Sequence, residues 1–212
     1  MADLETARTN LFEYLDQEIE DKRVIEAMKR VPREAFVPRE HYYAAYENRP
    51  LSIGFGQTIS QPLIVALMVQ ALELKCGEKV LELGTGSGYE AAILAELAER
   101  VVTVECIPEL AESAKQVLEK LGYPNIEVHI AGKTLGWAKE APYDAIIVSA
   151  GAPSIPKVLL DQLAWGGRMI IPVGSRWQQE LIKVTKRKKA NKVENLGGCF
   201  FVPLIGEGAW EE

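Results

Sequence analysis

The residues best suited to bind a cofactor are concentrated between positions 82 and 105. A glycine-rich loop, Gly84-Thr85-Gly86-Ser87-Gly88, follows an apolar run and precedes a segment of helical character. Glycines in such a turn let backbone N–H groups approach a ligand closely and permit positive φ angles. The next apolar run ends at Glu105, where a carboxylate could accept hydrogen bonds from both hydroxyls of a ribose. This order of elements predicts a site for an adenosine-containing cofactor.

The spacing of the glycines narrows the choice of cofactor. It is GxGxG, whereas dinucleotide-binding loops are typically GxGxxG. A nicotinamide-dependent oxidoreductase is therefore disfavoured, although it stays open as an alternative. A strand-to-helix turn that binds no ligand is the other interpretation of the loop, and the position of Glu105 weighs against it.

The composition sets limits on the class of protein. The chain has 212 residues, of which 48% are hydrophobic and 25% are charged, as in an ordinary globular domain. Its 24 basic and 30 acidic residues give a net charge of -6, and non-specific nucleic-acid binding needs an excess of basic residues. We therefore expect one domain spanning residues 1–212 and no nucleic-acid partner.

The cysteines and histidines do not form a metal-binding pattern. Cys76, Cys106 and Cys199 are scattered, and His41 and His129 lie far apart in the sequence. We expect no metal site and no disulfide framework, as in a reducing cytoplasm. The first residues lack the features of a signal peptide, and no apolar run approaches the ~20 residues of a membrane helix. We therefore expect a cytoplasmic protein with no membrane partner.

The elements that would position the cofactor loop alternate along the chain. Short apolar runs predict strands, and the amphipathic segments between them predict helices. The predicted strands span 80–83, 101–105, 126–130, 144–148 and 168–173, and the predicted helices span 63–72, 89–98, 108–121 and 156–163. Such alternation indicates an α/β fold, with a Rossmann-like, doubly wound, mostly parallel sheet that carries helices on both faces.

The two ends of the chain depart from this alternation. Residues 4–19 and 24–30 predict two N-terminal helices, and residues 180–186 and 193–202 predict antiparallel C-terminal strands. Between residues 47 and 62 prolines and glycines interrupt every regular pattern, which predicts a long loop of the kind that often has a function. We therefore divide the domain into N-terminal helices with an active-site loop (1–62), a cofactor-binding core (63–175) and C-terminal strands (176–212).

Several motifs resemble one known family. Residues 80–89 (VLELGTGSGY) resemble the first motif of class I S-adenosylmethionine-dependent methyltransferases. Residues 33–38 (REAFVP) and 56–62 (GQTISQP) resemble signatures of one branch, the protein-L-isoaspartate (D-aspartate) O-methyltransferases. Further matches follow in order at 141–148, 162–168, 172–174 and 201–204. The resemblance extends from about residue 8 to residue 210, nearly the whole chain.

The resemblance implies a protein repair reaction. A methyl group would pass from S-adenosyl-L-methionine to the free carboxylate of an L-isoaspartyl residue, or to the matching carboxylate of a D-aspartyl residue, in a damaged protein, leaving S-adenosyl-L-homocysteine. A carboxylate is already ionised at neutral pH, so this nucleophile needs no strong general base. The enzyme would align the reacting atoms and exclude water. The alternative is a degenerate relative that binds cofactor or peptide without efficient turnover.

The resemblance also assigns roles to individual residues. It implies that Ser60 is the catalytic residue, whereas the residues around it also suit a helix N-cap. The implied cofactor-binding residues are Thr58, Ser60, Gly84, Thr85, Gly86, Ser87, Gly88, Glu105, Cys106, Gly132 and Lys133. The implied substrate-binding residues are Ile59, Ser60, Val202, Pro203 and Leu204.

The chain departs from the family pattern at one cofactor position. Members of the family usually have Gly-Asp-Gly where this chain has Ala131-Gly132-Lys133, and the aspartate is expected to contact the adenine amino group. Gly132 cannot supply that carboxylate, which is the reason for keeping the non-catalytic alternative. Cys106 is a milder departure, because the family often has a basic residue there.

Overall fold

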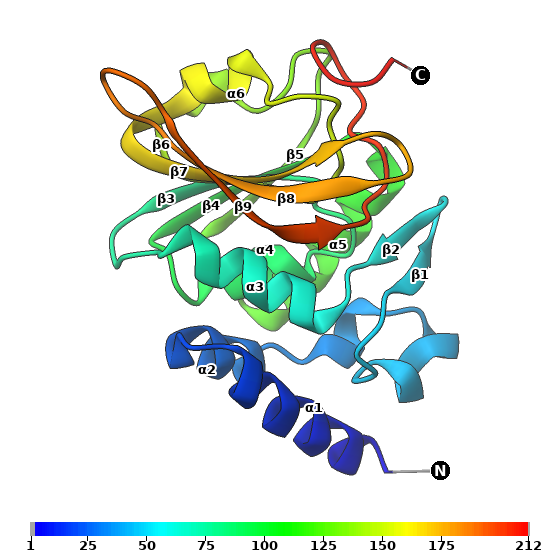
Figure 1. The fold of residues 1–212 in the computed structure, drawn as a ribbon. Coiled ribbons are helices and arrows are strands. Elements are labelled where there is room, and N and C mark those ends of the chain that lie inside the picture. The colour runs from blue at the N-terminus through cyan, green and yellow to red at the C-terminus, as the bar shows by residue number, and fades with distance from the viewer. Residues whose placement is uncertain (1–2, 212) are drawn as a thin grey trace.

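A seven-stranded sheet lies at the centre of the computed structural model, which describes residues 3–211 (Figure 1). The strand order is β5-β4-β3-β6-β7-β8-β9, with parallel pairing from β5 to β7 and antiparallel pairing from β7 to β9. The strands are β3 (Lys79–Leu83), β4 (Arg100–Glu105), β5 (Ile126–Ile130), β6 (Tyr143–Val148), β7 (Leu163–Gly174), β8 (Gln179–Thr185) and β9 (Lys192–Cys199). The predicted α/β class and the antiparallel C-terminal strands are confirmed.

The order of the strands creates a point of divergence. The chain runs outward from β3 through β4 to β5, then returns to the other side of β3 to form β6 and β7. The connections that leave β3 and β6 therefore run in opposite directions. In open α/β sheets such a switch point leaves a crevice at the carboxyl ends of the strands, where ligands bind.

Both faces of the sheet are covered, which explains why the central strands read as apolar runs. Val80 of β3 packs in one hydrophobic cluster with residues of α3 (Pro62–Leu72), α4 (Tyr89–Ala95) and α5 (Pro108–Leu121). Leu81 and Leu83 face the opposite side and pack in a second cluster with residues of α6 (Lys157–Gln162). Side chains of a strand alternate between its faces, so a strand buried on both faces is mostly apolar, and in β3 the buried Glu82 is an exception.

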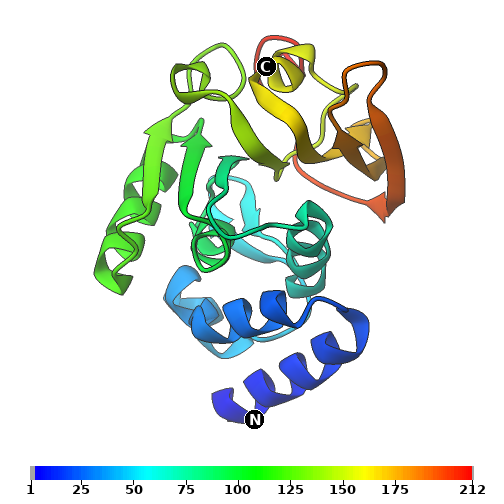
Figure 2. The ribbon, with the colours of Figure 1, turned by 90° about the vertical axis from the view of Figure 1, so that its left-hand side faces the viewer.

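The N-terminal helices form an extra layer. Figures 1 and 2 show α1 (Leu4–Glu18) and α2 (Lys22–Arg30) beyond α3 and α4, on the side away from the sheet. Two short 3-10 helices, η1 (Arg33–Phe36) and η2 (Arg39–Ala44), lead from this layer towards the sheet, and a third, η3 (Ala138–Glu140), precedes β6. Buried residues of α1 and α2, including Leu15 and Met28, join the same hydrophobic cluster as α3 and α4.

The prediction of an irregular loop over residues 47–62 is wrong. The segment contains a hairpin of β1 (Leu51–Gly54) and β2 (Gln57–Ile59), with Leu51 paired to Ile59. Its turn, Gly54-Phe55-Gly56, has φ angles of 89°, 53° and 71°. The glycines therefore form a tight turn between two strands. Strands of four and three residues are too short to produce a recognisable period.

Gly88 and Gly122 offer a matched test of helix packing. Both have positive φ, 88° and 81°, and each lies at the end of a helix. A Cβ on Gly88 would lie 3.2 Å from Leu118 Cδ1 and 3.3 Å from Ala114 Cβ, whereas a Cβ on Gly122 would meet nothing within 4 Å.

We expect Gly122→Ala to lower the free energy of unfolding by about 1–2 kcal/mol, the usual cost of a left-handed backbone with a side chain. Gly88→Ala should cost about 1–3 kcal/mol more, because it also overpacks the contact between α4 and α5. Urea denaturation of both variants measures the difference. An equal loss of unfolding free energy in the two variants would show that α5 makes room for the new Cβ at position 88 without an energetic cost.

Candidate cofactor and acceptor site

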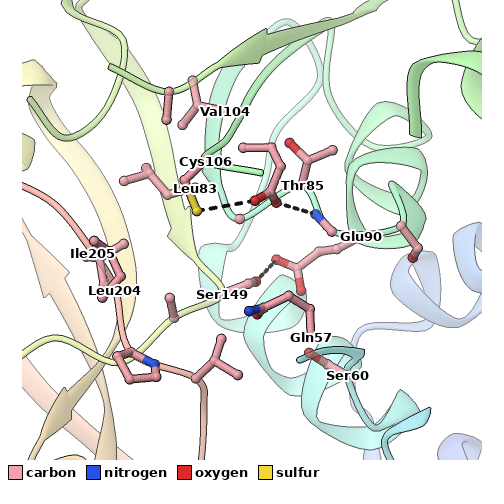
Figure 3. Close-up of a pocket in the computed structure, with 18 of the residues that line it drawn as sticks. Gln57, Ser60, Leu83, Thr85, Glu90, Val104, Cys106, Ser149, Leu204 and Ile205 are labelled. Atoms are coloured by element: carbon pink, nitrogen blue, oxygen red, sulfur yellow. Dashed lines mark hydrogen bonds between the residues drawn. The ribbon is translucent and has the colours of Figure 1, made fainter. Parts of the chain in front are cut away.

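A pocket opens at the carboxyl ends of β3, β4 and β6, where the strand order diverges (Figure 3). Its walls come from parts of the chain that are distant in sequence. They are the hairpin end (57–60), the glycine loop, the end of β4 with Cys106, the segment after β5 (131–136), the segment after β6 (149–150) and residues 202–205. The ends of parallel strands and two loops therefore converge on one cavity.

The glycine loop has the conformation that its sequence predicts. Gly84 and Gly86 have φ angles of 93° and 52°. A Cβ on Gly84 would lie 3.5 Å from the side chain of Ser149, and one on Gly86 would lie 3.4 Å from Ile53 Cδ1 in the hairpin. Side chains at these positions would narrow the space between the loop, β6 and the hairpin. The loop thus leaves its backbone accessible to a ligand.

Glu105 is held in place by the backbone around it. Its carboxylate accepts hydrogen bonds from the N–H groups of Gly86 (2.8 Å) and Ile107 (3.0 Å), and the Cys106 thiol lies 3.5 Å from Oε1. The side chain is almost fully buried, yet it lines the pocket. A carboxylate has about four acceptor positions, so it retains capacity for further donors such as ribose hydroxyls. This arrangement fits the adenosine cofactor that the sequence predicts.

Two further carboxyl groups lie beside this pocket. Glu90, on α4, lines it and accepts a hydrogen bond from Ser149 Oγ (2.9 Å), as Figure 3 shows. Glu82, on β3, is fully buried, and neither of its oxygens has a hydrogen-bond partner within residues 3–211. Burial raises the pKa of Glu90 to about 7. Burial, and then the charge of Glu90, raise the pKa of Glu82 well above its usual range. The two groups therefore resist joint ionisation at neutral pH.

Among residues 3–211, those that line the pocket include Glu90 and Glu105 but no lysine or arginine. A ligand that carries positive charge is thus favoured over an anionic one. The walls also contain apolar side chains, including Val104, Leu135 and Leu204, on which a flat ring could pack. Apolar walls with a small number of polar groups are typical of a site for a small molecule.

Ser60 lies on the hairpin side of the pocket, between β2 and α3. The interpretation of Ser60 as a helix N-cap is wrong, because α3 begins at Pro62 with Gln61 as its N-cap residue. The N–H of Leu63 donates instead to Oδ1 of Asn48 (3.1 Å). The Ser60 hydroxyl has no hydrogen-bond partner within residues 3–211, and Figure 3 shows the residue beside Gln57 at the pocket. Its hydroxyl is thus available to a ligand.

Most of the residues that the resemblance implied meet in this one pocket. The lining includes Thr58, Ile59, Ser60, Gly84, Thr85, Gly86, Ser87, Glu105, Cys106, Gly132, Val202, Pro203 and Leu204. Gly88 and Lys133 lie outside the lining. The Gly88 N–H donates to the carbonyl of Thr85 within the turn (2.8 Å), and the Lys133 carbonyl accepts from the Glu207 N–H (3.0 Å). These two residues support the walls rather than forming them.

Sequence reasoning missed several lining residues. Ser149 follows β6, and the rule that strand ends converge could have indicated it. Tyr89 and Glu90 open α4 directly after the glycine loop, so their position was a signal as well. Leu135 and Ile205 come from irregular segments and carry no such signal.

One group of possible metal ligands lies elsewhere in the described part of the chain. Glu127, His129 and Glu140 approach one another closely, but none lines the pocket. Arg100 Nη2 already lies 2.6 Å from Glu127 Oε1 and 2.5 Å from Glu140 Oε2. The guanidinium therefore occupies the place that a cation would take. Among residues 3–211, no helix has the length and apolar character that crossing a bilayer requires.

The raised pKa of Glu90 predicts a pH-dependent stability. Its pKa is about 7 in the folded protein, against an ordinary value of 4.5, so the folded state binds this proton more tightly. Ionisation then destabilises the fold progressively as the pH rises from about 4.5 to about 7. Glu90→Gln should be more stable than the parent by about 1–3 kcal/mol at pH 8, and the difference should vanish below pH ~4.5.

Denaturation curves between pH 4 and pH 8 measure this difference. Glu109→Gln removes an exposed acid from the first turn of α5 and is the matched control. A Glu90→Gln advantage that does not depend on pH would contradict the assignment.

Comparisons with known proteins agree with this geometry. The family model described as protein-L-isoaspartate(D-aspartate) O-methyltransferase matches residues 6–209. The chain is 54% identical, over the full length of both, to protein-L-isoaspartate O-methyltransferase 1 of Syntrophobacter fumaroxidans. It is 52% identical to the protein-L-isoaspartate O-methyltransferase of Methanoculleus marisnigri, covering 91% of this chain and 88% of that one.

Solved structures point to the same family. A protein-L-isoaspartate O-methyltransferase superposes with a TM-score of 0.87 at 28% identity, covering 95% of this chain and 67% of that one. A Plasmodium falciparum structure, described as a protein-L-isoaspartate O-methyltransferase in complex with S-adenosyl-L-homocysteine, gives a TM-score of 0.80 at 26% identity, covering 92% and 96%. Because the family model and full-length relatives match almost every residue, the chain belongs to the protein-L-isoaspartate (D-aspartate) O-methyltransferase family.

Proposed function

We propose that the chain transfers a methyl group from S-adenosyl-L-methionine to the free carboxylate of L-isoaspartyl residues in damaged proteins. Membership of the family makes this the expected reaction. The observation that carries the proposal is that one pocket is lined both by Ser60, whose hydroxyl has no partner within residues 3–211, and by the glycine loop with Glu105. D-aspartyl residues, whose carboxylate has a matching geometry, are a second class of acceptor.

The cofactor would be held by the sheet side of the pocket. Glu105 would accept hydrogen bonds from the ribose hydroxyls, and the glycine loop with Thr58 would surround the amino-acid end. The segment from Ala131 to Leu135, with Cys106, would contact the adenine. When bound, S-adenosyl-L-methionine supplies a methyl group activated by its positive sulfur. The acids near the pocket and the absence of lysine and arginine from its lining favour that charge.

The acceptor would be held by the hairpin side. A carboxylate is ionised at neutral pH, so the chain needs to orient it rather than to remove a proton. The Ser60 hydroxyl would donate a hydrogen bond to one carboxylate oxygen and direct the other towards the methyl group. Ile59, Val202, Pro203 and Leu204 would flank the acceptor and exclude water. Methyl transfer would join the acceptor oxygen to the methyl carbon while the bond from that carbon to the sulfur breaks, and the sulfur would keep the electron pair.

The sequence also supports a proposal about the compartment, the domain organisation and the partners of the chain. We infer that the chain works in the cytoplasm as a single domain spanning residues 1–212, with N-terminal helices and an active-site loop (1–62), a cofactor-binding core (63–175) and C-terminal strands (176–212). The scattered spacing of Cys76, Cys106 and Cys199 and a net charge of -6 support a reducing compartment and protein rather than nucleic-acid partners.

A pair of synthetic peptides tests the proposal. The full chain should methylate a peptide that contains L-isoaspartate and leave its normal aspartyl isomer unmodified. Equal labelling of both peptides would overturn the acceptor assignment. Binding of S-adenosyl-L-homocysteine without any methyl transfer would favour the alternative of a degenerate relative that does not turn over. Calorimetric titration with NAD checks the oxidoreductase alternative, which requires that NAD bind.

Ser60→Ala should reduce turnover of the isoaspartyl peptide by about 10- to 100-fold, because a hydrogen bond to a charged group contributes about 1.5–3 kcal/mol. The melting temperature should not change, since the hydroxyl has no partner within residues 3–211. The affinity for S-adenosyl-L-homocysteine should change by less than about threefold. Ser52→Ala, on β1 and outside the pocket lining, is the matched control. Unchanged turnover in Ser60→Ala would rule out the role of the hydroxyl.

Gly132→Asp tests the departure from the family pattern. Gly132 is exposed, its φ lies outside the left-handed region, and a Cβ there would meet nothing within 4 Å. The fold should therefore tolerate the aspartate. If the new carboxylate accepts a hydrogen bond from the adenine amino group, the dissociation constant for S-adenosyl-L-homocysteine should fall by about two- to tenfold.

Gly132→Ala provides the control for the added Cβ. If Asp and Ala variants bind the cofactor product equally well, other groups of this chain hold the adenine. The missing aspartate would then give no support to a non-catalytic relative.

A further inference from the structure

Arg33 is a fully buried arginine directly behind the pocket. It opens η1, in the segment that joins the N-terminal helices to the hairpin, and it does not line the pocket itself. Neither the cofactor nor the acceptor chemistry described above uses it. Its burial is unusual, because charged side chains are almost never fully buried unless they are paired.

The contacts of Arg33 reach both sides of the pocket. Its Nη2 donates to the backbone carbonyl of Ser60 (2.8 Å), and its Nε donates to the carbonyl of Ala45 (2.8 Å). The guanidinium carbon lies 4.7 Å from the centroid of the Tyr89 ring. Tyr89 follows the glycine loop and lines the pocket, as Ser60 does. One side chain therefore joins the acceptor residue, the start of α4 and the end of η2.

Stability alone does not account for this arrangement. Arg33 forms no ion pair with an acidic side chain within residues 3–211, and its Nη1 is buried without a hydrogen-bond partner. Burial lowers the pKa of its guanidinium below the usual value. An uncompensated buried charge is destabilising, although the contact with the tyrosine ring offsets part of the cost.

Arg168 shows what a buried arginine with a structural role looks like in the same chain. Its two terminal nitrogens bind the Glu78 carboxylate at 2.8 and 2.7 Å, and further bonds go to the carbonyls of Leu72 and Glu73. Its charge is thus paired, and it lies outside the pocket lining. Both arginines bind carbonyls near the ends of α3, but only Arg33 does so beside the pocket.

We propose that Arg33 is a positioning residue that sets the orientation of Ser60 relative to the cofactor loop. This inference rests on the proposed function. By holding the Ser60 carbonyl, the guanidinium fixes the peptide unit between Ser60 and Gln61, and hence the direction of the Ser60 side chain. By packing on the ring of Tyr89, the guanidinium also fixes the position of Ser60 relative to α4, the helix that follows the glycine loop. The N-terminal layer would thereby help to align acceptor and methyl donor.

The test compares Arg33→Met and Arg33→Lys with Arg168→Met in the full chain. Methionine removes the charge while keeping an apolar side chain of similar length, and lysine keeps the charge but cannot bind two carbonyls in the same way. We expect Arg33→Met to lower kcat for the isoaspartyl peptide by about 10- to 100-fold, the effect of a small misplacement of a reacting group. Its affinity for S-adenosyl-L-homocysteine should change by less than about threefold.

The controls separate positioning from loss of stability. Assays run well below the melting temperature of each variant keep all of them folded. Arg168→Met should lower the melting temperature yet leave kcat within about twofold of the parent. The kcat of Arg33→Lys should lie between those of Arg33→Met and the parent. Parent-like kcat in a folded Arg33→Met or Arg33→Lys variant would overturn the proposal, as would an equal loss of kcat in Arg168→Met.

A second measurement does not depend on the reaction. Amide hydrogen exchange over residues 57–63 should be faster in Arg33→Met than in the parent, and should be unchanged in Arg168→Met. If the parent chain methylates no isoaspartyl peptide, the proposed function fails, and exchange still decides whether Arg33 orders this segment. If the parent is active and exchange is unchanged in Arg33→Met, the positioning role fails alone.

Discussion

The carboxylate of Glu105 is the contact on which the rest of the pocket depends. It accepts N–H groups from the glycine loop after β3 and from the residue that precedes α5, so one side chain ties together the carboxyl ends of two neighbouring strands. Within residues 3–211 it forms no ion pair, so backbone donors hold it and leave it acceptor capacity for a ligand in the pocket. The divergence of the chain at β3 then keeps the space above these strands open.

Buried ionisable side chains are concentrated around this pocket. Glu82 and Glu90 lie on elements that flank the glycine loop, and Arg33 lies behind Ser60 and Tyr89. Each of these groups would be less costly at the surface or in a close ion pair, as Arg168 and Glu78 form elsewhere. Sites that bind charged ligands and reactive groups commonly retain such buried ionisable residues. Their number here marks the pocket as the functional centre of the molecule.

The pocket has two sides with different origins. The parallel sheet supplies the cofactor side from the ends of β3, β4 and β6 together with the segment after β5, a geometry that many α/β proteins share. The side that we propose holds the acceptor comes from the hairpin, which precedes the strands of the main sheet in the sequence, and from residues 202–205, which follow them. The hairpin and the segment after β9 therefore complete, around a general α/β sheet, the side of the pocket that we propose holds the acceptor.

The sequence by itself determined the alternation of strands and helices, the glycine loop and Glu105, because each depends on local spacing and on burial within a few residues. The tertiary structure alone decided the hairpin within residues 47–62, the capping of α3 by Asn48, and the hydrogen bond between Ser149 and Glu90. The contact of Arg33 with Ser60 joins residues 27 positions apart. Such contacts arise from how separate segments pack, and no period or motif in either segment encodes its partner.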